Sequence, residues 1–287
     1  MDIKLKLADL VIGIEGFPYD NVPDNMKPFV CDEYNVKSDF QYNVSYCPIG
    51  RDAYMGGDKL FENNKRTIYK LQKKYFVLLR YSFLNSKEQS IITMFDVEEK
   101  RAEIHIPKAV TELSYGLGIF MDCLDIDLVL LLFNRIIMHA SVVKYHDRAI
   151  LFSGPSGIGK STQANLWKKY MNADILNGDR ATIDISKDII DVYGSPYAGS
   201  SKIYRNESAP LEAIVLLKQG KENSIRQLEG MELYRNMYPR FSFARWDDRL
   251  SDISMNIMEE IISRVPVYEL TCLPDEGAVK LVRDTIF

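Results

Sequence analysis

The sequence predicts a mixed α/β (α+β) protein, with a β-rich N-terminal domain over residues 1–110 and a mixed-sheet phosphate-binding domain over residues 111–287. Three observations support this prediction. Short apolar runs separated by polar turns fill the first part of the chain. The spacing of apolar residues becomes helical from about residue 109. A phosphate-binding loop motif, Gly154 to Ser161, stands between a predicted strand and a predicted helix.

The N-terminal domain is predicted to be built from short strands. In chain order they are Ile3–Ile14, Phe40–Tyr46, Thr67–Leu71, Tyr75–Tyr81, Ser90–Phe95 and Arg101–Ile106. Short strands on a turn-rich frame indicate an antiparallel sheet. The polar stretches 19–37 and 51–65 are expected to be surface loops, and the domain could serve as a substrate-recognition or lid region.

Residues 109–138 are predicted to form a helical connection, because Leu124, Leu128 and Leu131 recur at helical spacing. Two strands then follow, Met138–Tyr145 and Arg148–Ser153, joined by a two-residue turn. A tight hairpin cannot join parallel strands, so this arrangement indicates a mixed sheet.

The octet Gly-Pro-Ser-Gly-Ile-Gly-Lys-Ser matches the pattern G-x-x-x-x-G-K-[ST]. Its glycines allow successive backbone N–H groups to point at phosphate oxygens, and the following helix adds its positive N-terminal end. Lys160 supplies a mobile positive charge, and Ser161 is positioned to ligate magnesium. The predicted nucleotide-binding residues are Gly154, Pro155, Ser156, Gly157, Ile158, Gly159, Lys160, Ser161 and Thr162.

Asp179 is the second candidate metal ligand. The predicted helix from Ser161 ends near Tyr170, and a short apolar run then leads into Gly178 and Asp179. A carboxylate at the end of this strand would return to the side of the phosphate loop, where it could ligate magnesium or accept a proton. The alternative is that Asp179 only forms a turn after Gly178.

The C-terminal part is predicted to alternate between strands and helices. The predicted elements are a hairpin of Ala181–Ile185 and Asp188–Tyr193, strands Leu211–Leu217 and Val267–Leu270, and helices Gly230–Tyr238, Asp248–Ser263 and Asp275–Ile286. Asp184 is expected to be a solvated charge of the hairpin. The loop Gly194–Lys202 could contact phosphate or the acceptor, or could be a plain surface loop. Arg240, Arg245 and Arg249 cluster around Trp246, and any of them could reach a phosphate or stack on adenine. Basic residues that flank helices are usually solvated, so the three are left out of the predicted site.

Composition excludes several classes of protein. The formal net charge is −4, which argues against a chain-wide electrostatic surface for nucleic acid or membrane. The longest apolar run, Leu128–Phe133, is too short to cross a bilayer. The four cysteines form no C-x-x-C pair and the three histidines have no zinc-ligand spacing, so we expect a cytoplasmic protein with reduced thiols and no zinc.

The run from His139 to Arg180 resembles the catalytic core of HPr kinase/phosphorylase. It combines His-Ala-Ser-Val-Val, the phosphate-binding loop with Thr162, a short helix and Gly-Asp-Arg. That family shares a nucleotide-binding fold with ATP-dependent phosphoenolpyruvate carboxykinase. Gly-Ser-Pro-Tyr-Ala-Gly, from Gly194 to Gly199, together with Asn206, looks like the HPr-kinase-like serine kinases of lasso-peptide clusters.

The resemblance implies roles for individual residues. Gly154 to Thr162 would bind ATP, Ser161 would help to hold the metal, Asp179 would lie at the catalytic centre, and His139 would lie near the phosphates. The HPr kinases carry two adjacent aspartates where this chain has Gly178 and Asp179. This difference leaves open whether Asp179 is the base, a metal ligand or both, and whether any reverse phosphorylase activity exists.

The sequence therefore predicts a kinase that uses ATP and Mg²⁺ to phosphorylate a hydroxyl, with a serine of a peptide or small protein as the expected acceptor. His139, Lys160 and Asp179 are the expected catalytic residues. Two alternatives remain open at this stage. The acceptor could be a small molecule such as free serine, a sugar or a nucleoside, or the chain could be an ATP-binding scaffold without chemistry. The relatives that the chain resembles often form rings or dimers, so a homo-oligomer is also conceivable.

Overall fold

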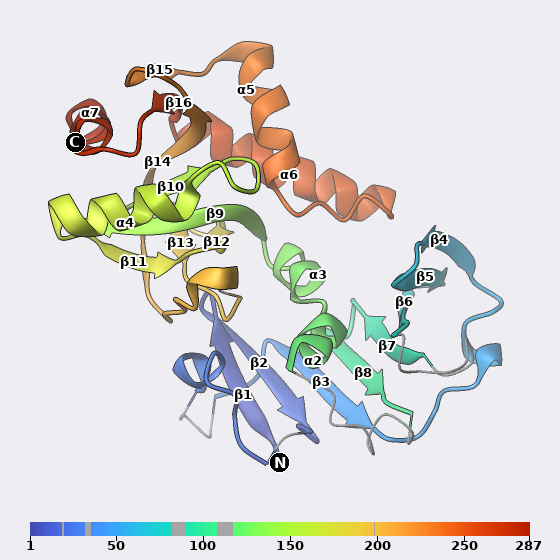
Figure 1. Cartoon of the computed structure of the whole chain (residues 1–287). Helices are drawn as coiled ribbons and strands as arrows, with labels where there is room; N and C mark the ends of the chain where they lie inside the picture. Colours follow the sequence, from blue (N-terminus) through green and yellow to red (C-terminus); the bar gives the residue numbers. More distant parts are fainter. Residues whose placement is uncertain (19, 32–35, 82–89, 108–116, 198) are drawn as a thin grey trace. The chain divides into compact units, whose positions relative to one another are not determined.

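The computed structural model describes residues 1–18, 20–31, 36–81, 90–107, 117–197 and 199–287. The chain divides into two compact units, Met1–Leu132 and Phe133–Phe287. Each unit has its own β-sheet (Figure 1). The predicted α+β class, with a β-rich first part and a mixed-sheet second part, is confirmed.

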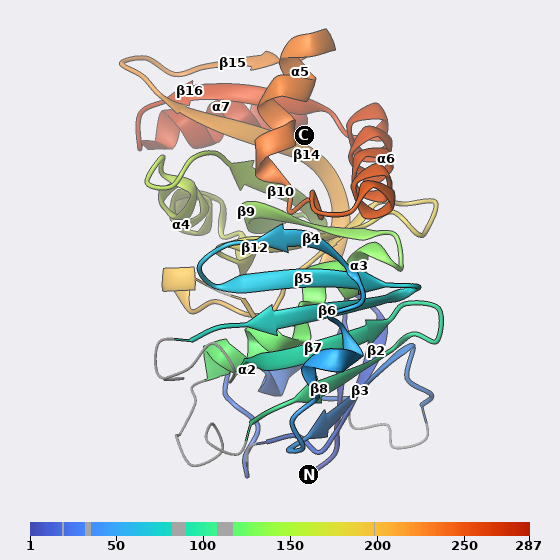
Figure 2. The same cartoon turned by 90° about the vertical axis from the view of Figure 1, so that its right-hand side faces the viewer.

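The first unit contains an eight-stranded sheet with the order β1-β2-β3-β8-β7-β6-β5-β4. Its strands are β1 (Ile3–Leu7), β2 (Leu10–Glu15), β3 (Phe40–Ser45), β4 (Asp58–Glu62), β5 (Arg66–Leu71), β6 (Lys74–Leu79), β7 (Ile91–Asp96) and β8 (Arg101–His105). Figure 2 shows β4 to β8 following one another across this sheet. β4 lies inside the stretch 51–65, which the sequence predicted to be a loop, so that part of the prediction is wrong.

The predicted antiparallel arrangement of this sheet is only partly right. β3 pairs in parallel with both β2 and β8, whereas the other pairs are antiparallel. β2 and β3 are joined by the long stretch 16–39, and β3 and β8 are separated by the inserted meander β4–β7. A long connection of this kind permits parallel pairing, and no local pattern in the sequence indicates it.

The helices α2 (Leu117–Leu124) and α3 (Ile126–Leu131) belong to the first unit, so the boundary lies at Leu132 rather than near residue 110. Thr93 on β7 donates a hydrogen bond to the carbonyl of Cys123 (2.8 Å), and Tyr42 on β3 donates to the carbonyl of Leu124. Asp125, with φ of 40°, separates the two helices. Burial of their apolar side chains on the first sheet therefore assigns these helices to the first unit.

The second unit contains a mixed sheet and four α-helices within its described residues. The strands are β9 (Arg135–Tyr145), β10 (Arg148–Ser153), β11 (Asp174–Asn177), β12 (Arg180–Asp184), β13 (Asp191–Tyr193), β14 (Ser208–Gln219), β15 (Ser224–Gln227) and β16 (Val267–Cys272). The helices are α4 (Lys160–Met171), α5 (Gly230–Met237), α6 (Asp248–Arg264) and α7 (Glu276–Ile286). The predicted β9–β10 hairpin and the helix after the phosphate loop are both confirmed.

Two long strands, β9 and β14, give this sheet its form. β9 pairs with β12 over its first half and with β10 over its second half, and β14 pairs first with β13 and then with β10. Part of the sheet is therefore a closed ring of paired strands, in the order β10, β9, β12, β13, β14 and back to β10. Beyond β14, the sheet continues with β16 and then β15. β10, β14 and β16 are parallel neighbours, so their carboxyl ends share one edge.

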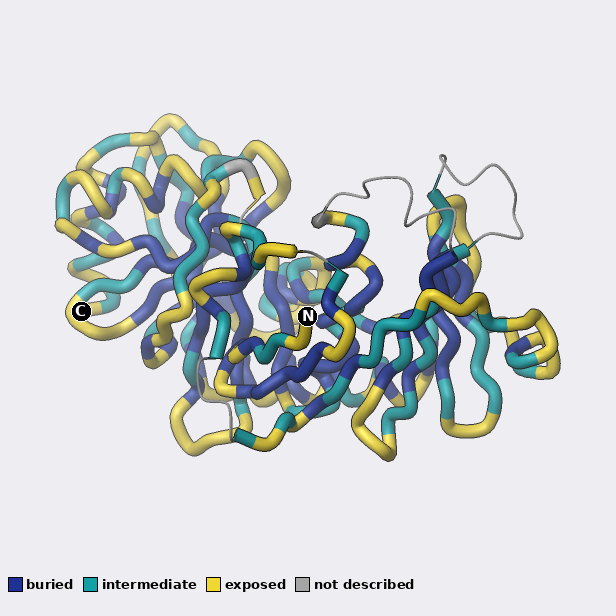
Figure 3. The backbone as a smooth tube through the Cα atoms, turned by 90° about the horizontal axis from the view of Figure 1, so that it is seen from below, coloured by how far each residue is buried: buried dark blue, intermediate teal, exposed yellow. Residues whose placement is uncertain are grey.

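Helices cover both faces of this sheet. α4 and α7 pack on one face around Trp167, Val279 and Val282, all fully buried, and α6 lies on the other side of β10 and β14 (Figure 2). Figure 3 shows the buried stretches, in dark blue, running through the interior of both sheets while exposed residues gather in loops. Among the described helices, none combines the length and apolar character needed to cross a bilayer.

Asp184 was predicted to be solvated, and this prediction is wrong. Its carboxylate is fully buried and lies 3.0 Å from the guanidinium of Arg135. Asp184 and Arg135 are directly paired across β12 and β9. A buried carboxylate needs such a partner, and only the strand pairing supplies it.

Candidate active site

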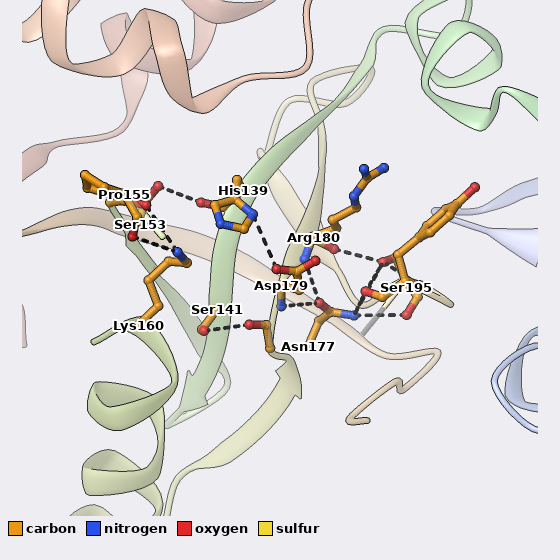
Figure 4. Close-up of polar contacts among 12 residues, drawn as sticks. His139, Ser141, Ser153, Pro155, Lys160, Asn177, Asp179, Arg180 and Ser195 are labelled. Carbon is orange, nitrogen blue, oxygen red and sulfur yellow. Dashed lines mark hydrogen bonds and ion pairs between the residues drawn. The ribbon is translucent and has the colours of Figure 1, made fainter. Parts of the chain in front are cut away.

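The candidate site is organised around the middle of β9. Along one edge of this strand, β11 and β12 follow one another and are interrupted at Gly178 and Asp179. Along the other edge, β10 pairs with residues 140–145, and Phe241 then forms a bridge with Met138. His139 lies where the pairing partner of β9 changes along both of its edges, from β12 to β11 on one edge and from Phe241 to β10 on the other. The phosphate loop and Asp179 therefore meet beside His139 (Figure 4), and Phe241 pairs with the preceding residue, Met138.

The phosphate loop begins where β10 ends. Ser153, the last residue of β10, donates a hydrogen bond from its hydroxyl to the carbonyl of His139 (2.7 Å), which fixes the start of the loop against β9. Gly157 and Gly159 have φ of 77° and 116°, in the region that favours glycine. Gly159 directly precedes helix α4, so the loop leads into a helix N-terminus, as the motif predicts.

Lys160 lies folded over the loop. Its side chain is only 8% exposed, and its ammonium group donates to the carbonyls of Gly154 and Pro155, both at 3.2 Å. Burial lowers the pKa of Lys160, the carboxylate of Asp179 opposes this shift, and the positive charge of Arg240 adds to it. The ammonium group therefore lies within electrostatic range of both side chains.

Asp179 is held by a turn around Asn177. The side-chain carbonyl of Asn177 accepts hydrogen bonds from the backbone N–H groups of Asp179 (2.8 Å) and Arg180 (2.9 Å). On the other side, the carbonyl of Asp179 accepts from the N–H of Ala140 on β9 (2.9 Å). The backbone of Asp179 is thus fixed from two directions, and its side chain is 31% exposed.

The carboxylate of Asp179 approaches the imidazole of His139, with 3.4 Å between Oδ1 and Nδ1 (Figure 4). The pKa of His139 is lowered, mainly by burial and then by the positive charge of Lys160, while Asp179 partly opposes the shift. His139 is consequently neutral at neutral pH, and a neutral imidazole can accept a proton. With the side chain 45% exposed, a substrate can reach the ring.

Arg240 is a site residue that the sequence analysis left out. It closes the short helix η4 (Tyr238–Arg240), next to the bridge between Phe241 and Met138. Its positive charge lowers the pKa values of both His139 and Lys160. Its buried Nε–H donates to no acceptor among the residues that the structure describes. The sequence shows a basic cluster that could reach a phosphate, but it does not indicate that Arg240 is the member beside β9, because that depends on the pairing of Phe241 with the distant Met138.

The segment that follows β13 lies against Asp179. The amide of Asn177 donates to the carbonyls of Ser195 (2.9 Å) and Tyr197 (3.0 Å), so the same side chain orients Asp179 and ties down this segment. Gly199 has φ of 52°, and a Cβ added there would lie 2.8 Å from Cγ of Asp179. The glycines and serines of the loop Gly194–Lys202 were a usable sequence signal for such close packing, but they did not indicate that Asp179 would be the residue contacted.

The remaining predicted nucleotide-binding residues form the exposed rim of the loop. Pro155, Ser156, Ser161 and Thr162 are exposed, and Ile158 is half-buried. Of the predicted catalytic residues, His139 and Asp179 are in direct proximity and Lys160 is within electrostatic range of both. The predicted residues thus gather at one place.

The donors present fit a magnesium ion that is shared with a nucleotide. Magnesium in phosphoryl-transfer sites commonly takes one or two protein oxygens and completes its shell with phosphate and water. The exposed hydroxyl of Ser161 and the carboxylate of Asp179 are donors of this kind. Among the described residues, no three His, Cys, Asp or Glu side chains gather closely enough to hold a metal ion.

No family model matches the chain, and no curated protein sequence matches it. Among solved structures, the chain is similar to the HPr(Ser) kinase/phosphatase from Coxiella burnetii, with a TM-score of 0.30 and 12% identity. The match covers 52% of this chain and 95% of that one. A likeness at this level does not assign an activity, and nothing in these comparisons bears on the resemblance to lasso-peptide kinases.

Proposed function

We propose that this protein is a magnesium-dependent kinase that transfers the γ-phosphoryl group of ATP to a hydroxyl. One observation carries the proposal: a phosphate-binding loop, its lysine, a neutral histidine and a carboxylate converge at the middle of β9. Phosphoryl transfer needs cations for the charge of the phosphates and a group that orients or deprotonates the nucleophile. This site has both.

The reaction can be written from these residues. The oxygen of the acceptor hydroxyl forms a bond to the γ-phosphorus, the bond from that phosphorus to the bridging oxygen breaks, and ADP leaves. The hydroxyl proton passes to the carboxylate of Asp179 or to the imidazole of His139. Lys160 and the backbone N–H groups of the loop stabilise the negative charge of the phosphates. Bound magnesium, held by Ser161 and Asp179, would neutralise phosphate charge as well.

The acceptor that we propose is a serine hydroxyl in a peptide or small protein. Support comes from the resemblance of the run His139–Arg180 to serine kinases of the HPr kinase type. The exposure of His139 and Asp179 is compatible with a large acceptor, because both side chains can be reached from solvent. A panel of serine-containing peptides incubated with ATP and analysed by mass spectrometry tests this choice against free serine, sugars and nucleosides.

The first prediction concerns Lys160 and Asp179. We expect Lys160→Ala and Asp179→Asn each to lower phosphoryl transfer from labelled ATP by a factor on the order of 10² to 10³, since each removes a charge from the reacting centre. Lys168→Ala, on the exposed side of the same helix, and Asp147→Asn, in the exposed β9–β10 turn, should transfer phosphate at the wild-type rate.

Wild-type rates in both Lys160→Ala and Asp179→Asn would end the mechanism. If the wild-type chain binds ATP but releases no ADP with any acceptor, the chain is instead an ATP-binding scaffold. Circular dichroism of each variant would show that a lost activity does not reflect a lost fold.

A further inference from the structure

A cavity borders the phosphate loop at Gly157, Ile158 and Gly159. It has a volume of about 430 Å³ and lies between the loop, the first turns of α4 and the carboxyl ends of β14 and β16. Parallel α/β sheets bind their ligands at the carboxyl ends of strands, and this volume is in the range of small-molecule sites. Thr162 lines the cavity and belongs to the predicted phosphate-binding residues, so a nucleotide held by the loop would be continuous with it.

The walls of this cavity are mostly apolar. Ile158 contributes from the loop, Leu217 from the end of β14, and Leu273 from the residue after β16. Apolar side chains of this kind suit the faces of an aromatic base, because the base gains dispersion contacts and its apolar faces leave water.

One polar side chain at the cavity has an oxygen atom without a donor among the described residues. Gln163 is only 2% exposed, and it lines the cavity from helix α4. Its amide nitrogen donates to the sulfur of Cys272 (3.3 Å), a weak acceptor. Its amide oxygen Oε1 is buried and accepts no hydrogen bond from any residue that the structure describes. A buried amide oxygen without a donor is costly, so a ligand that offers an N–H group would bind favourably here.

We propose that this cavity binds the adenine base of the nucleotide and that Gln163 recognises its amino edge. Oε1 would accept a hydrogen bond from the exocyclic amino group, and the amide nitrogen would donate to a ring nitrogen beside it. Glutamine makes this bidentate pair with adenine, whereas the corresponding edge of guanine presents two acceptors and would leave Oε1 unpaired. The inference rests on the proposed function for the placement of the phosphates, but it concerns binding and not transfer.

The test compares the binding of Mg-ADP, Mg-GDP and inorganic tripolyphosphate to the full chain by calorimetry. We expect the wild type to bind ADP at least about fivefold more tightly than GDP, the lower end of what one bidentate pair provides. In Gln163→Leu the ADP/GDP ratio should fall to about one, while tripolyphosphate binds as in the wild type, since only the base contact is lost. Asn165→Ala, exposed on the same helix, should keep the wild-type ratio.

A second variant covers the case that Gln163→Leu does not fold. Leu273 is 39% exposed at the cavity, and Leu273→Trp should fill part of it, weakening ADP binding without weakening tripolyphosphate binding. A wild type without preference for ADP over GDP, or a Gln163→Leu protein that keeps the preference, would overturn the proposal.

The two proposals can fail separately. ADP selectivity that depends on Gln163 in a protein without transferase activity would support the base site and remove the kinase. Transferase activity with equal use of ATP and GTP would support the kinase and remove the base site.

Discussion

His139 is the residue whose ionisation the site controls most clearly. Burial and the charge of Lys160 lower its pKa below the ordinary 6.5. If the neutral imidazole assists the acceptor hydroxyl, activity should persist as the pH falls through 6.5 and be lost only at lower pH. The unfolded chain binds the proton more readily in that window, so the same shift also weakens the folded state as the pH falls.

The measurement is kcat/KM from about pH 5 to pH 8 for the wild type and for His139→Gln. We expect His139→Gln to have low activity over the whole range. Its activity should not fall further at acidic pH, because the titrating imidazole is absent. His146→Gln, in the exposed turn between β9 and β10, is the matched control and should retain the wild-type profile. An acidic limb that is unchanged in His139→Gln would exclude this role.

The second prediction for a single residue concerns Arg240. Its positive charge lowers the pKa values of Lys160 and His139, and its buried Nε–H has no acceptor among the described residues. We expect Arg240→Ala to lower kcat by a factor on the order of 10² or more, as for other cations that stabilise a transferring phosphoryl group, with partial recovery in Arg240→Lys. Arg249→Ala, exposed in the first turn of α6, removes the same charge and should leave the rate unchanged. Equal rates in Arg240→Ala and the wild type would show that Arg240 does not contact the phosphates.

At the scale of elements, the fixed position of Asp179 depends on the segment around Gly199. Gly199 has φ of 52°, and a Cβ there would lie 2.8 Å from Cγ of Asp179. Gly199→Ala should therefore displace the carboxylate and lower kcat by about tenfold or more, as small misplacements of reacting groups do. Gly230→Ala is the matched control, because Gly230 has φ of 55° but open space around the added Cβ. If both variants lose the same activity, backbone strain and not the contact with Asp179 is responsible.

At the scale of the whole molecule, the site is assembled from segments that are far apart in the sequence. Hydrogen–deuterium exchange should show this directly: Mg-ADP is expected to protect backbone amides in residues 153–163 and, together with them, in 177–180 and 239–242. The middle of α6, residues 252–263, serves as the reference and should not change. Protection confined to 153–163 would mean that bound nucleotide does not engage the other two segments.

Much of the second unit could be predicted from the sequence because its signals are local. The glycines of the phosphate loop, the apolar run before it and the helix formers after it act on neighbouring residues, and the structure has a strand, loop and helix there. The β9–β10 hairpin was predicted for the same reason, since two strands and a short turn between them are contiguous. His139 and Lys160 could be named from the motif and the resemblance alone.

What only the tertiary structure decided is which distant residues become neighbours. Arg240 joins the site because Phe241 pairs with Met138, and Asp184 is buried because β12 places it opposite Arg135. Parallel pairing in the first sheet and the boundary at Leu132 likewise depend on contacts between segments that are separated along the chain. Local propensity and spacing act over a few residues, whereas electrostatic partners and burial are set by strand pairing across the whole fold.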